Sequence, residues 1–411
     1  DKETLPQNII EPSGAFKHRL LKSAAIYGAN ASGKSNFIKA IEFMTAFVRE
    51  SVVGDNNTRI DVTPFAFDNE CAGKPSLFEA DFIHEGIRYV YGFTVDAERV
   101  HEEWLYSFPK GQQATLFERF LDEQHKPQYK FNRSLSKSKD LVGKTRHNSL
   151  FLTVATQFNV DFAGKINEWF YLFRPLPSIE YSMPVITSKM VLNDNNNKNL
   201  IVDFLKKADL EISDFEVEEK TIEVDETSIK MLRTLLKNLD KNGNVFKPPP
   251  SEAPKMLSEF MIKFHHRIRT SQGEETFMPM DFKNESDGTQ RLFQLAGHII
   301  STLNYQLNVF SDELDLRLHP LLSEWLLEFF HNYKKDSTAQ MLFTTHNTEL
   351  LNPELFRRDQ IWFAEKGHSD GASSLFSLSD YKARKGENFR KNYLDGRYGA
   401  IPILQKFDMH K

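Results

Sequence analysis

The chain has 411 residues, with 52 Lys and Arg against 57 Asp and Glu, so its net charge is −5. This balance argues against a surface coated with basic charge for non-specific binding to nucleic acid. The length exceeds that of one ordinary domain, and the single cysteine, Cys71, excludes both an intramolecular disulfide and a zinc site made of several cysteines.

The distribution of apolar residues and cysteine favours a protein of the cytoplasm. No apolar run is long enough to span a bilayer, so we expect no membrane association. A near-absence of cysteine is typical of compartments where thiols stay reduced, which gives the cytoplasmic expectation. The chain starts at Asp1 with neither Met nor a signal-peptide pattern, so we expect residues of the natural protein to precede it.

The first predicted element is a short, mostly apolar strand at 23–27, with a turn directly after it. From Ser35 onward the pattern becomes helical, because apolar residues recur on one face. These apolar positions are Phe37, Ile38, Ile41, Met44, Phe47 and Val48.

The next segment is predicted to be an antiparallel meander. Its three strands cover 76–84, 87–95 and 100–108, and the second alternates most clearly between apolar and other residues. Residues 134–148 are polar and basic, and we expect a loop there. Its basic part, Lys137 to Arg146, is a candidate for contact with a nucleic-acid backbone, with a solvated loop as the alternative.

The sequence of the second half of the chain predicts an insertion followed by more α/β structure. Residues 160–239 are mostly helical in pattern, and the three prolines after Lys247 mark a linker. The remaining predicted elements are an Asn-rich loop at 193–199, a strand at 215–224, a hairpin of 262–269 and 275–282, a helix at 289–303, a strand at 307–310, a helix at 321–333 and a strand at 340–345. We therefore expect an α/β protein in three parts, which are 1–159, a mostly helical insertion at 160–276, and 277–411.

Residues 28–35 match the phosphate-binding pattern G-x-x-x-x-G-K-[ST] in full. Glycine lets the backbone approach phosphate oxygens, and the helix that follows presents its positive end to an anion. Lys34 would contact the β- and γ-phosphates, and the Ser35 hydroxyl would bind Mg²⁺. The predicted nucleotide-binding residues of this loop are Gly28, Ala29, Asn30, Ser32, Gly33, Lys34, Ser35 and Asn36.

A P-loop also needs a carboxylate on a nearby strand to hold the metal ion. Asp312 and Glu313 follow the predicted strand at 307–310. Asp312 would bind Mg²⁺, and Glu313 would orient and polarise the attacking water. Taken alone, the pair is also consistent with an ordinary acidic turn.

Further polar residues strengthen the interpretation as a nucleotide site. Ser286 and Gly288 stand at the start of a predicted helix, where they could hold a γ-phosphate or form an ordinary helix cap. Asp315 follows the carboxylate pair, with a helix-start acid as its alternative. His346 ends the predicted strand at 340–345, which can neighbour the carboxylate strand in a parallel sheet and so approach the γ-phosphate.

This order of motifs resembles the ATPase heads of the ABC class, as in the SMC and OLD families. Within that class it is similar to compact bacterial phage-defence ATPases, namely the RloA and AbiL types, Septu PtuA and PARIS AriA. The narrower resemblance is carried by residues 26–36, by 312–315 with 318–322, and by 393–402. In this resemblance Ser286 to Arg291 is the signature, Asp315 marks the D-loop and His346 is the switch histidine.

The resemblance implies an ATP- and Mg²⁺-dependent ATPase, with Lys34, Glu313 and His346 as its catalytic residues. It also implies a head-to-tail dimer in which Ser286 and Gly288 of one copy complete the site of the other. Gln157 is placed at the Q-loop, as a metal-contacting residue, with a surface glutamine as the alternative. Two residues depart from the class pattern. Asp287 stands where the signature has Gly, and Ser311 replaces an apolar residue.

The function expected from this resemblance is a nucleotide-gated dimer that holds and activates a separate effector nuclease of the TOPRIM or HNH type. Alternatives are an SMC-like DNA-repair head, a self-contained nuclease, and a scaffold that binds ATP with little or no hydrolysis. The segment 160–282 is too short for a long coiled coil, which argues against the first of these alternatives. A tail at 393–402 and the insertion are the candidate partner surfaces.

Overall fold

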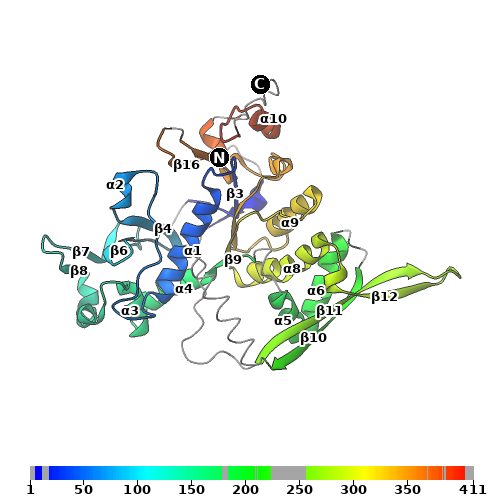
Figure 1. Ribbon diagram of the computed structural model, residues 1–411, viewed down its shortest axis with the longest axis horizontal. Coiled ribbons are helices and arrows are strands. Elements are labelled where there is room, and N and C mark those ends of the chain that lie inside the picture. The colour runs from blue at the N-terminus through cyan, green and yellow to red at the C-terminus, as the bar shows by residue number, and fades with distance from the viewer. Residues whose placement is uncertain are drawn as a thin grey trace, which may run out of the picture. The chain divides into compact units, whose positions relative to one another are not determined.

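A computed structural model describes residues 5–11, 18–177, 184–208, 210, 212–223, 256–367, 369–381, 383 and 386–402 (Figure 1). The chain forms two compact units. Unit 1 comprises Asp1–Leu176, Thr302–Asp315 and Ser323–Lys411, and unit 2 comprises Pro177–Ser301 and Leu316–Leu322. No helix of the described residues is both long enough and apolar enough to cross a membrane.

Unit 1 is built around a six-stranded sheet with the strand order β16-β15-β3-β14-β13-β9. Within this sheet β15, β3, β14, β13 and β9 run parallel to one another, and only β16 is antiparallel. The strands are Ser23–Tyr27 (β3), Phe173–Pro175 (β9), Asn308–Ser311 (β13), Gln340–Thr344 (β14), Ile361–Lys366 (β15) and Ser373–Ser377 (β16). The predicted strands at 23–27, 307–310 and 340–345 are confirmed, as is the parallel pairing of the last two.

The helices of the two units follow the predicted helical patterns closely. Those at 289–303 and 321–333 are confirmed, and the helix expected from Ser35 begins one residue earlier because Gly33 forms its cap. The main helices are Lys34–Glu50 (α1), Phe151–Gln157 (α3), Asp161–Leu172 (α4), Asp287–Tyr305 (α8), Pro320–Asn332 (α9) and Phe389–Leu394 (α10).

A five-stranded antiparallel meander forms the other sheet of unit 1, in the order β4-β5-β6-β7-β8. The three predicted strands are confirmed with their bounds, as Ser76–His84 (β4), Ile87–Val95 (β5) and Val100–Phe108 (β6). The sequence analysis missed Ala114–Leu121 (β7) and Pro127–Phe131 (β8). The expected loop at 134–148 is wrong for most of its length, because Arg133–Lys144 forms 3₁₀ helix.

Phenylalanine-rich packing joins this meander to α1, α3 and α4. Phe93 and Phe151 are fully buried, and Phe82 stacks on Trp169 with ring centroids 4.0 Å apart. Such aromatic pairs add to the free energy gained by removing large apolar surfaces from water. The helix α1, which carries the P-loop at its start, is thereby fixed to the meander along its second half, through Met44 and Val48.

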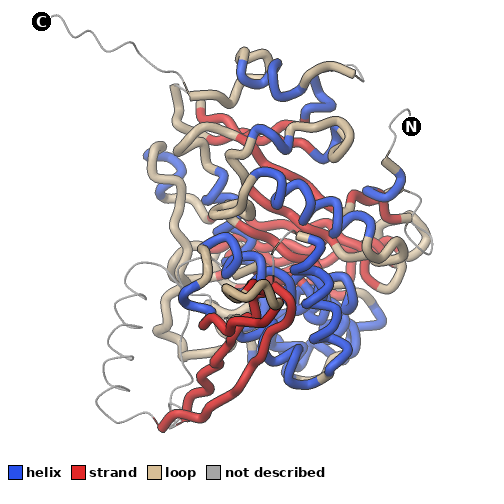
Figure 2. The backbone as a smooth tube through the Cα atoms, turned by 90° about the vertical axis from the view of Figure 1, so that its right-hand side faces the viewer, coloured by secondary structure: helices blue, strands red, loops and turns tan. Residues whose placement is uncertain are grey.

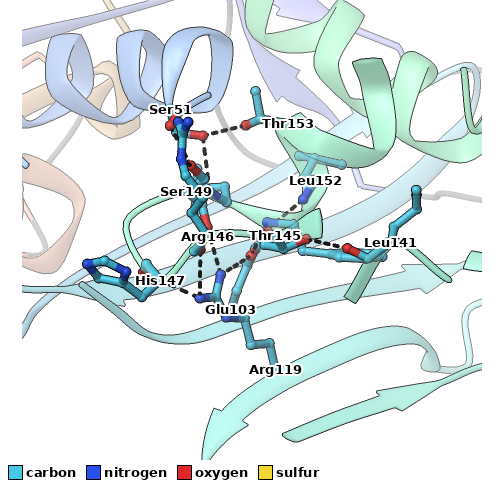
Figure 3. A network of polar contacts seen from close by, with 12 residues as sticks. Ser51, Glu103, Arg119, Leu141, Thr145, Arg146, His147, Ser149, Leu152 and Thr153 are labelled. Carbon is cyan, nitrogen blue, oxygen red and sulfur yellow. Dashed lines mark hydrogen bonds and ion pairs between the residues drawn. The ribbon is translucent and has the colours of Figure 1, made fainter. Parts of the chain in front are cut away.

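A buried polar network joins β6 and β7 of the meander to the start of α3 (Figure 3). The Glu103 carboxylate on β6 accepts hydrogen bonds from the amide N–H groups of Phe151 (2.6 Å) and Leu152 (2.9 Å) at the start of α3. Arg119 on β7 lies 3.8 Å from it and donates to the Ser149 carbonyl at 2.7 Å. Burial raises the pKa of Glu103, while Arg119 and the amide donors oppose that shift.

Hydroxyl groups extend this network to α1. Ser51, directly after α1, hydrogen-bonds the Thr153 hydroxyl at 2.9 Å, and Thr153 donates to the Val48 carbonyl at 2.8 Å (Figure 3). Because a buried charge without its partner costs several kcal/mol, roughly 3–5 for a broken buried pair, this set of contacts specifies one arrangement of β6, α3 and α1. α3 ends at Gln157, so the network also fixes the segment expected to carry the Q-loop.

Unit 2 contains a three-stranded antiparallel sheet, β10-β11-β12, and helices. Its long strands β10 and β11 can be followed in Figure 2. Phe293 of α8 meets Phe215 and Phe264 edge-on, with ring centroids 5.1 Å apart in both pairs, and forms its core. The elements are Val185–Asn193 (α5), Asn195–Lys207 (α6), Ile212–Glu223 (β10), Met256–Arg269 (β11) and Glu275–Asp281 (β12).

The hairpin expected from 262–269 and 275–282 is confirmed as the pairing of β11 with β12, and β11 begins earlier than predicted, at Met256. The Asn-rich loop expected at 193–199 is wrong, because Asp194 caps α6 through the Asn196 amide at 2.9 Å and the asparagines form its first turn. The predicted proline linker lies outside the described residues.

The division of the chain differs from the three predicted parts. α4 packs into the core of unit 1, so residues 160–176 are not part of the insertion. Residues 277–301, placed in the third part, belong to unit 2 together with β10 and β11. The insertion therefore carries a sheet as well as helices.

Candidate functional site

The phosphate-binding loop lies between β3 and α1, in unit 1. Gly28 has no room for a side chain, since a Cβ there would lie 2.4 Å from the Ala364 carbonyl oxygen and 2.6 Å from the Ser32 hydroxyl. Gly33 caps α1 with φ 102°, a conformation that favours glycine. Both glycines are therefore required by the geometry of the loop itself, apart from any ligand.

The polar groups of this loop suit an anion. The Ser32 hydroxyl is buried and has no hydrogen-bond partner among the described residues. The Lys34 ammonium is also buried and donates to the carbonyl oxygens of Gly28 (2.8 Å) and Ala29 (3.1 Å). Ser35 and Asn36 are exposed on the first turn of α1, whose free N–H groups and dipole favour negative charge.

The predicted carboxylates follow β13 at the same edge of the sheet. Ile26 is paired with Thr344, so the ends of β3 and β14 coincide, and Ser311 is paired with Phe343 one residue earlier. Asp312 and Glu313 therefore come after β13 where the P-loop comes after β3. Burial lowers the pKa of Lys34, while the charges of Asp312 and Glu313 oppose that shift.

Thr344 is a residue of this site that the sequence analysis missed. Its hydroxyl donates to Asp312 Oδ1 at 2.5 Å and accepts from the Glu313 amide at 2.8 Å. Glu313 has a φ of 50°, in the left-handed region that non-glycine residues seldom adopt. A strained backbone of this kind is often found where a side chain must be aimed at a site. The only sequence hint was the Thr-Thr pair before His346.

His346 joins the carboxylates at this edge. Its Nε2 lies 4.0 Å from Glu313 Oε1. Partial burial lowers the pKa of His346, and Lys34 lowers it further, whereas Glu313, Asp315 and Asp312 raise it. The charges of Lys34, Asp312, Glu313 and Asp315 thus all act on His346, so these five side chains form one electrostatic group.

The residues predicted to form the signature lie in unit 2. Ser286 is the cap of α8, because its hydroxyl accepts from the Thr289 amide at 3.1 Å. Asp287, the departure from the class pattern, pairs with Arg317 at 3.3 Å, and the Arg317 carbonyl lies 3.3 Å from the position of a Cβ on Gly288. The segment after Asp315 therefore touches the signature through Arg317, a second residue that the sequence analysis missed.

Gln157, predicted to contact the metal ion, and the tail at 393–402, predicted to be a partner surface, lie as follows in the structure. Gln157 is exposed at the end of α3, and its side chain makes no hydrogen bond to the described part of the chain. The tail at 393–402 is not a free aromatic surface, because Tyr393 and Tyr398 are buried against Phe363 of β15. Tyr393 also meets Tyr27, directly before the P-loop, with ring centroids 6.0 Å apart.

The sheet and this set of residues define a P-loop nucleotide-binding domain. The chain belongs to the family described as "AAA domain, putative AbiEii toxin, Type IV TA system", whose sequence model matches residues 23–352. That match spans the P-loop, both carboxylates and His346. A comparison with curated protein sequences gives no match.

Among solved structures, the chain is similar to heads of SMC proteins. The SMC head bound to the C-winged helix domain of ScpA is 12% identical, with 91% of this chain and 98% of that chain covered and a TM-score of 0.37. The SMC head domain from Thermotoga maritima is 14% identical, with 90% and 97% covered and a TM-score of 0.35. A head from Pyrococcus furiosus bound to a domain of ScpA is 12% identical, with 95% and 98% covered and a TM-score of 0.33.

The electrostatic group at the sheet edge makes a prediction for His346. Its pKa is expected below the ordinary value of 6.5. Removing the positive charge in Lys34→Met should raise this pKa, and removing the negative charge in Glu313→Gln should lower it. An NMR pH titration of the ring Cε1–H resonance, assigned by its loss in His346→Gln, measures both shifts. A pKa that stays the same in both variants would mean that these side chains are not neighbours.

Proposed function

We propose that the chain binds Mg²⁺ATP in the P-loop and hydrolyses it. The observation that carries the proposal is the Thr344 hydroxyl, which holds Asp312 and the Glu313 backbone at the edge of the sheet where the P-loop lies. A buried lysine, a metal-binding carboxylate and a second carboxylate with a neighbouring histidine are the groups that phosphoryl transfer to water requires.

The loop fits a polyphosphate by its own chemistry. The unpartnered Ser32 hydroxyl, the glycine positions without room for a side chain, and the Lys34 ammonium all suit phosphate oxygens. Lys34 would exchange its two carbonyl acceptors for phosphate oxygens. Ser35 and Asp312 would hold Mg²⁺, which when bound neutralises charge on the phosphates.

The roles of the remaining residues follow from their positions. Glu313 accepts the proton of the attacking water as general base, and its backbone bond to Thr344 keeps the carboxylate in place. His346, whose Nε2 lies 4.0 Å from Glu313 Oε1, can form a hydrogen bond beside that carboxylate or to the γ-phosphate. Lys34 stabilises the charge that gathers on the transferred phosphoryl group.

We further propose that two copies associate head-to-tail around the nucleotide. Ser286 and Gly288 stand at the start of α8, a 19-residue helix, where the N–H groups and the dipole attract a γ-phosphate. Leu316 and Leu321, in the segment that follows Asp315, are 46% and 67% exposed. Exposed leucines beside a polar motif are typical of an interface, and Asp315 would lie within it.

The two-copy site gives a direct prediction for Glu313→Gln. The carboxamide keeps the shape of the side chain but cannot take a proton, so this variant should bind ATP, hydrolyse at least about 100-fold more slowly, and accumulate as a dimer. Light scattering after size exclusion, with and without Mg²⁺ATP, measures the dimer. Lys34→Ala is the control, because it should bind nucleotide poorly and stay monomeric. Hydrolysis by Glu313→Gln at the wild-type rate would remove Glu313 from the catalytic role.

We propose that the biological role is anti-phage defence, in which the ATP-bound dimer holds a separate effector nuclease of the TOPRIM or HNH type. The family's description, which names a putative AbiEii toxin and a type IV TA system, supports this role. Among the described residues of unit 2, β12 pairs only with β11, and it exposes Phe277 (57%) and Met278 (43%), so it is the surface we assign to the partner.

The effector proposal predicts that the purified chain with Mg²⁺ATP cuts neither DNA nor RNA. Co-expression with its genomic neighbours should recover a nuclease on the tagged chain, identified by mass spectrometry, and Phe277→Ser with Met278→Ser should lose it. Leu77→Ser, on the 64%-exposed leucine of β4, is the matched surface control. Cleavage by the chain alone that disappears in Glu313→Gln would contradict the proposal.

A further inference from the structure

Phe67 is the most exposed phenylalanine of the described residues, with 70% of its surface accessible. It stands in the connection between α1 and β4, just before the short helix Asn69–Ala72 (α2) (Figure 1). Neither the catalytic roles above nor the proposed dimer uses it. A large apolar ring left in water is unfavourable, so a ligand that covers it would gain free energy.

The ring is held in place by its neighbours. The Lys366 ammonium lies 4.3 Å from the ring centroid, over one face. A Cβ on Gly371 would be 3.4 Å from Cβ and Cγ of Phe67, so the base of the side chain packs on the β15–β16 turn. Phe65 meets the ring edge-on, with centroids 5.8 Å apart. Phe67 is thus a fixed platform whose remaining surface faces solvent.

The same turn touches the phosphate-binding loop. A Cβ on Gly33 would lie 2.3 Å from the Ser373 hydroxyl and 2.7 Å from Ser373 Cβ, so the first residue of β16 is in contact with the loop. Ser373 is paired with Lys366 across β15 and β16, and Lys366 lies over the Phe67 ring. The aromatic platform therefore lies close to the phosphate cradle, and all these residues belong to unit 1.

We propose that Phe67 binds the base of the nucleotide by stacking, with Lys366 behind the ring. This inference rests on the proposed nucleotide binding and adds where the base lies. Because Lys366 touches the platform and its paired residue Ser373 touches the cradle, one molecule can reach both. Aromatic side chains stack on any nucleobase, and a purine offers the larger surface. Lys366 is on the covered face, so the base takes the open face.

The test compares a ligand that has a base with one that lacks it. Calorimetry of the full chain with Mg²⁺ should show that Phe67→Ala weakens ADP binding about 5- to 150-fold, the range expected for losing one base–aromatic stack. Binding of inorganic pyrophosphate should be the same as in the wild type. In Phe67→Trp, ADP should quench more tryptophan fluorescence than it does in the wild type, whose four tryptophans set the background, and pyrophosphate should not.

Tyr305→Ala is the matched control. Tyr305 is 73% exposed at the end of α8, before β13, and so lies toward the opposite edge of the sheet from Asp312. The Tyr305→Ala variant should bind ADP and pyrophosphate as the wild type does. Unchanged ADP affinity in Phe67→Ala, or equal quenching of Phe67→Trp by ADP and pyrophosphate, would overturn the stacking proposal. Wild-type chain that binds neither ADP nor ATP would instead overturn the proposed function.

Discussion

The site depends on one hydroxyl group. Thr344, at the end of the strand between β3 and β13, donates to Asp312 and accepts from the amide of Glu313. The Thr344 side chain is fully buried, and a polar group left without a partner there would cost about 1–3 kcal/mol. The parallel register that pairs Thr344 with Ile26 then sets the carboxylates against the P-loop.

The rest of unit 1 supports that arrangement from two directions. On one side, the Glu103–Arg119 network and the phenylalanine core fix α1 and α3 to the meander. On the other side, β15 and β16 press against the loop so closely that Ala364 and Ser373 leave no space for side chains at Gly28 and Gly33. The P-loop is thereby held at both its backbone and its helix, and the same contacts place Phe67 and Lys366 next to it.

How much of this could be predicted depends on the range of the interaction. Local patterns gave β3, the helix after it, the first three meander strands with their bounds, and the strands that carry the carboxylates and His346. The P-loop pattern is a local signature as well. Contacts across long sequence distances left no such trace, so Thr344, Arg317 and the close approach of Ser373 to Gly33 appeared only in three dimensions.

The predictions that were wrong failed because contacts with other parts of the chain outweighed the local sequence pattern. The asparagines at 195–197 were assigned to a loop by their propensity, but Asp194 supplies a cap and α6 begins on them. α4 has the helical pattern of the insertion, yet its apolar face is complementary to the meander core, which decides the unit it joins. The tail at 393–402 looked suited to a partner, but its tyrosines pack on Phe363 and Tyr27 of their own chain.

The central claim is that Thr344 organises a hydrolytic site. The most direct measurement is Mg²⁺-dependent phosphate release from ATP by the wild type, Thr344→Val and Ser337→Ala. Ser337 is a buried hydroxyl before β14, toward the opposite edge of the sheet, where it donates to the Leu303 carbonyl at 3.1 Å. The account predicts release by the wild type, a loss of about 5- to 150-fold in Thr344→Val with ADP binding retained, and little change in Ser337→Ala. Equal rates in Thr344→Val and the wild type would contradict it.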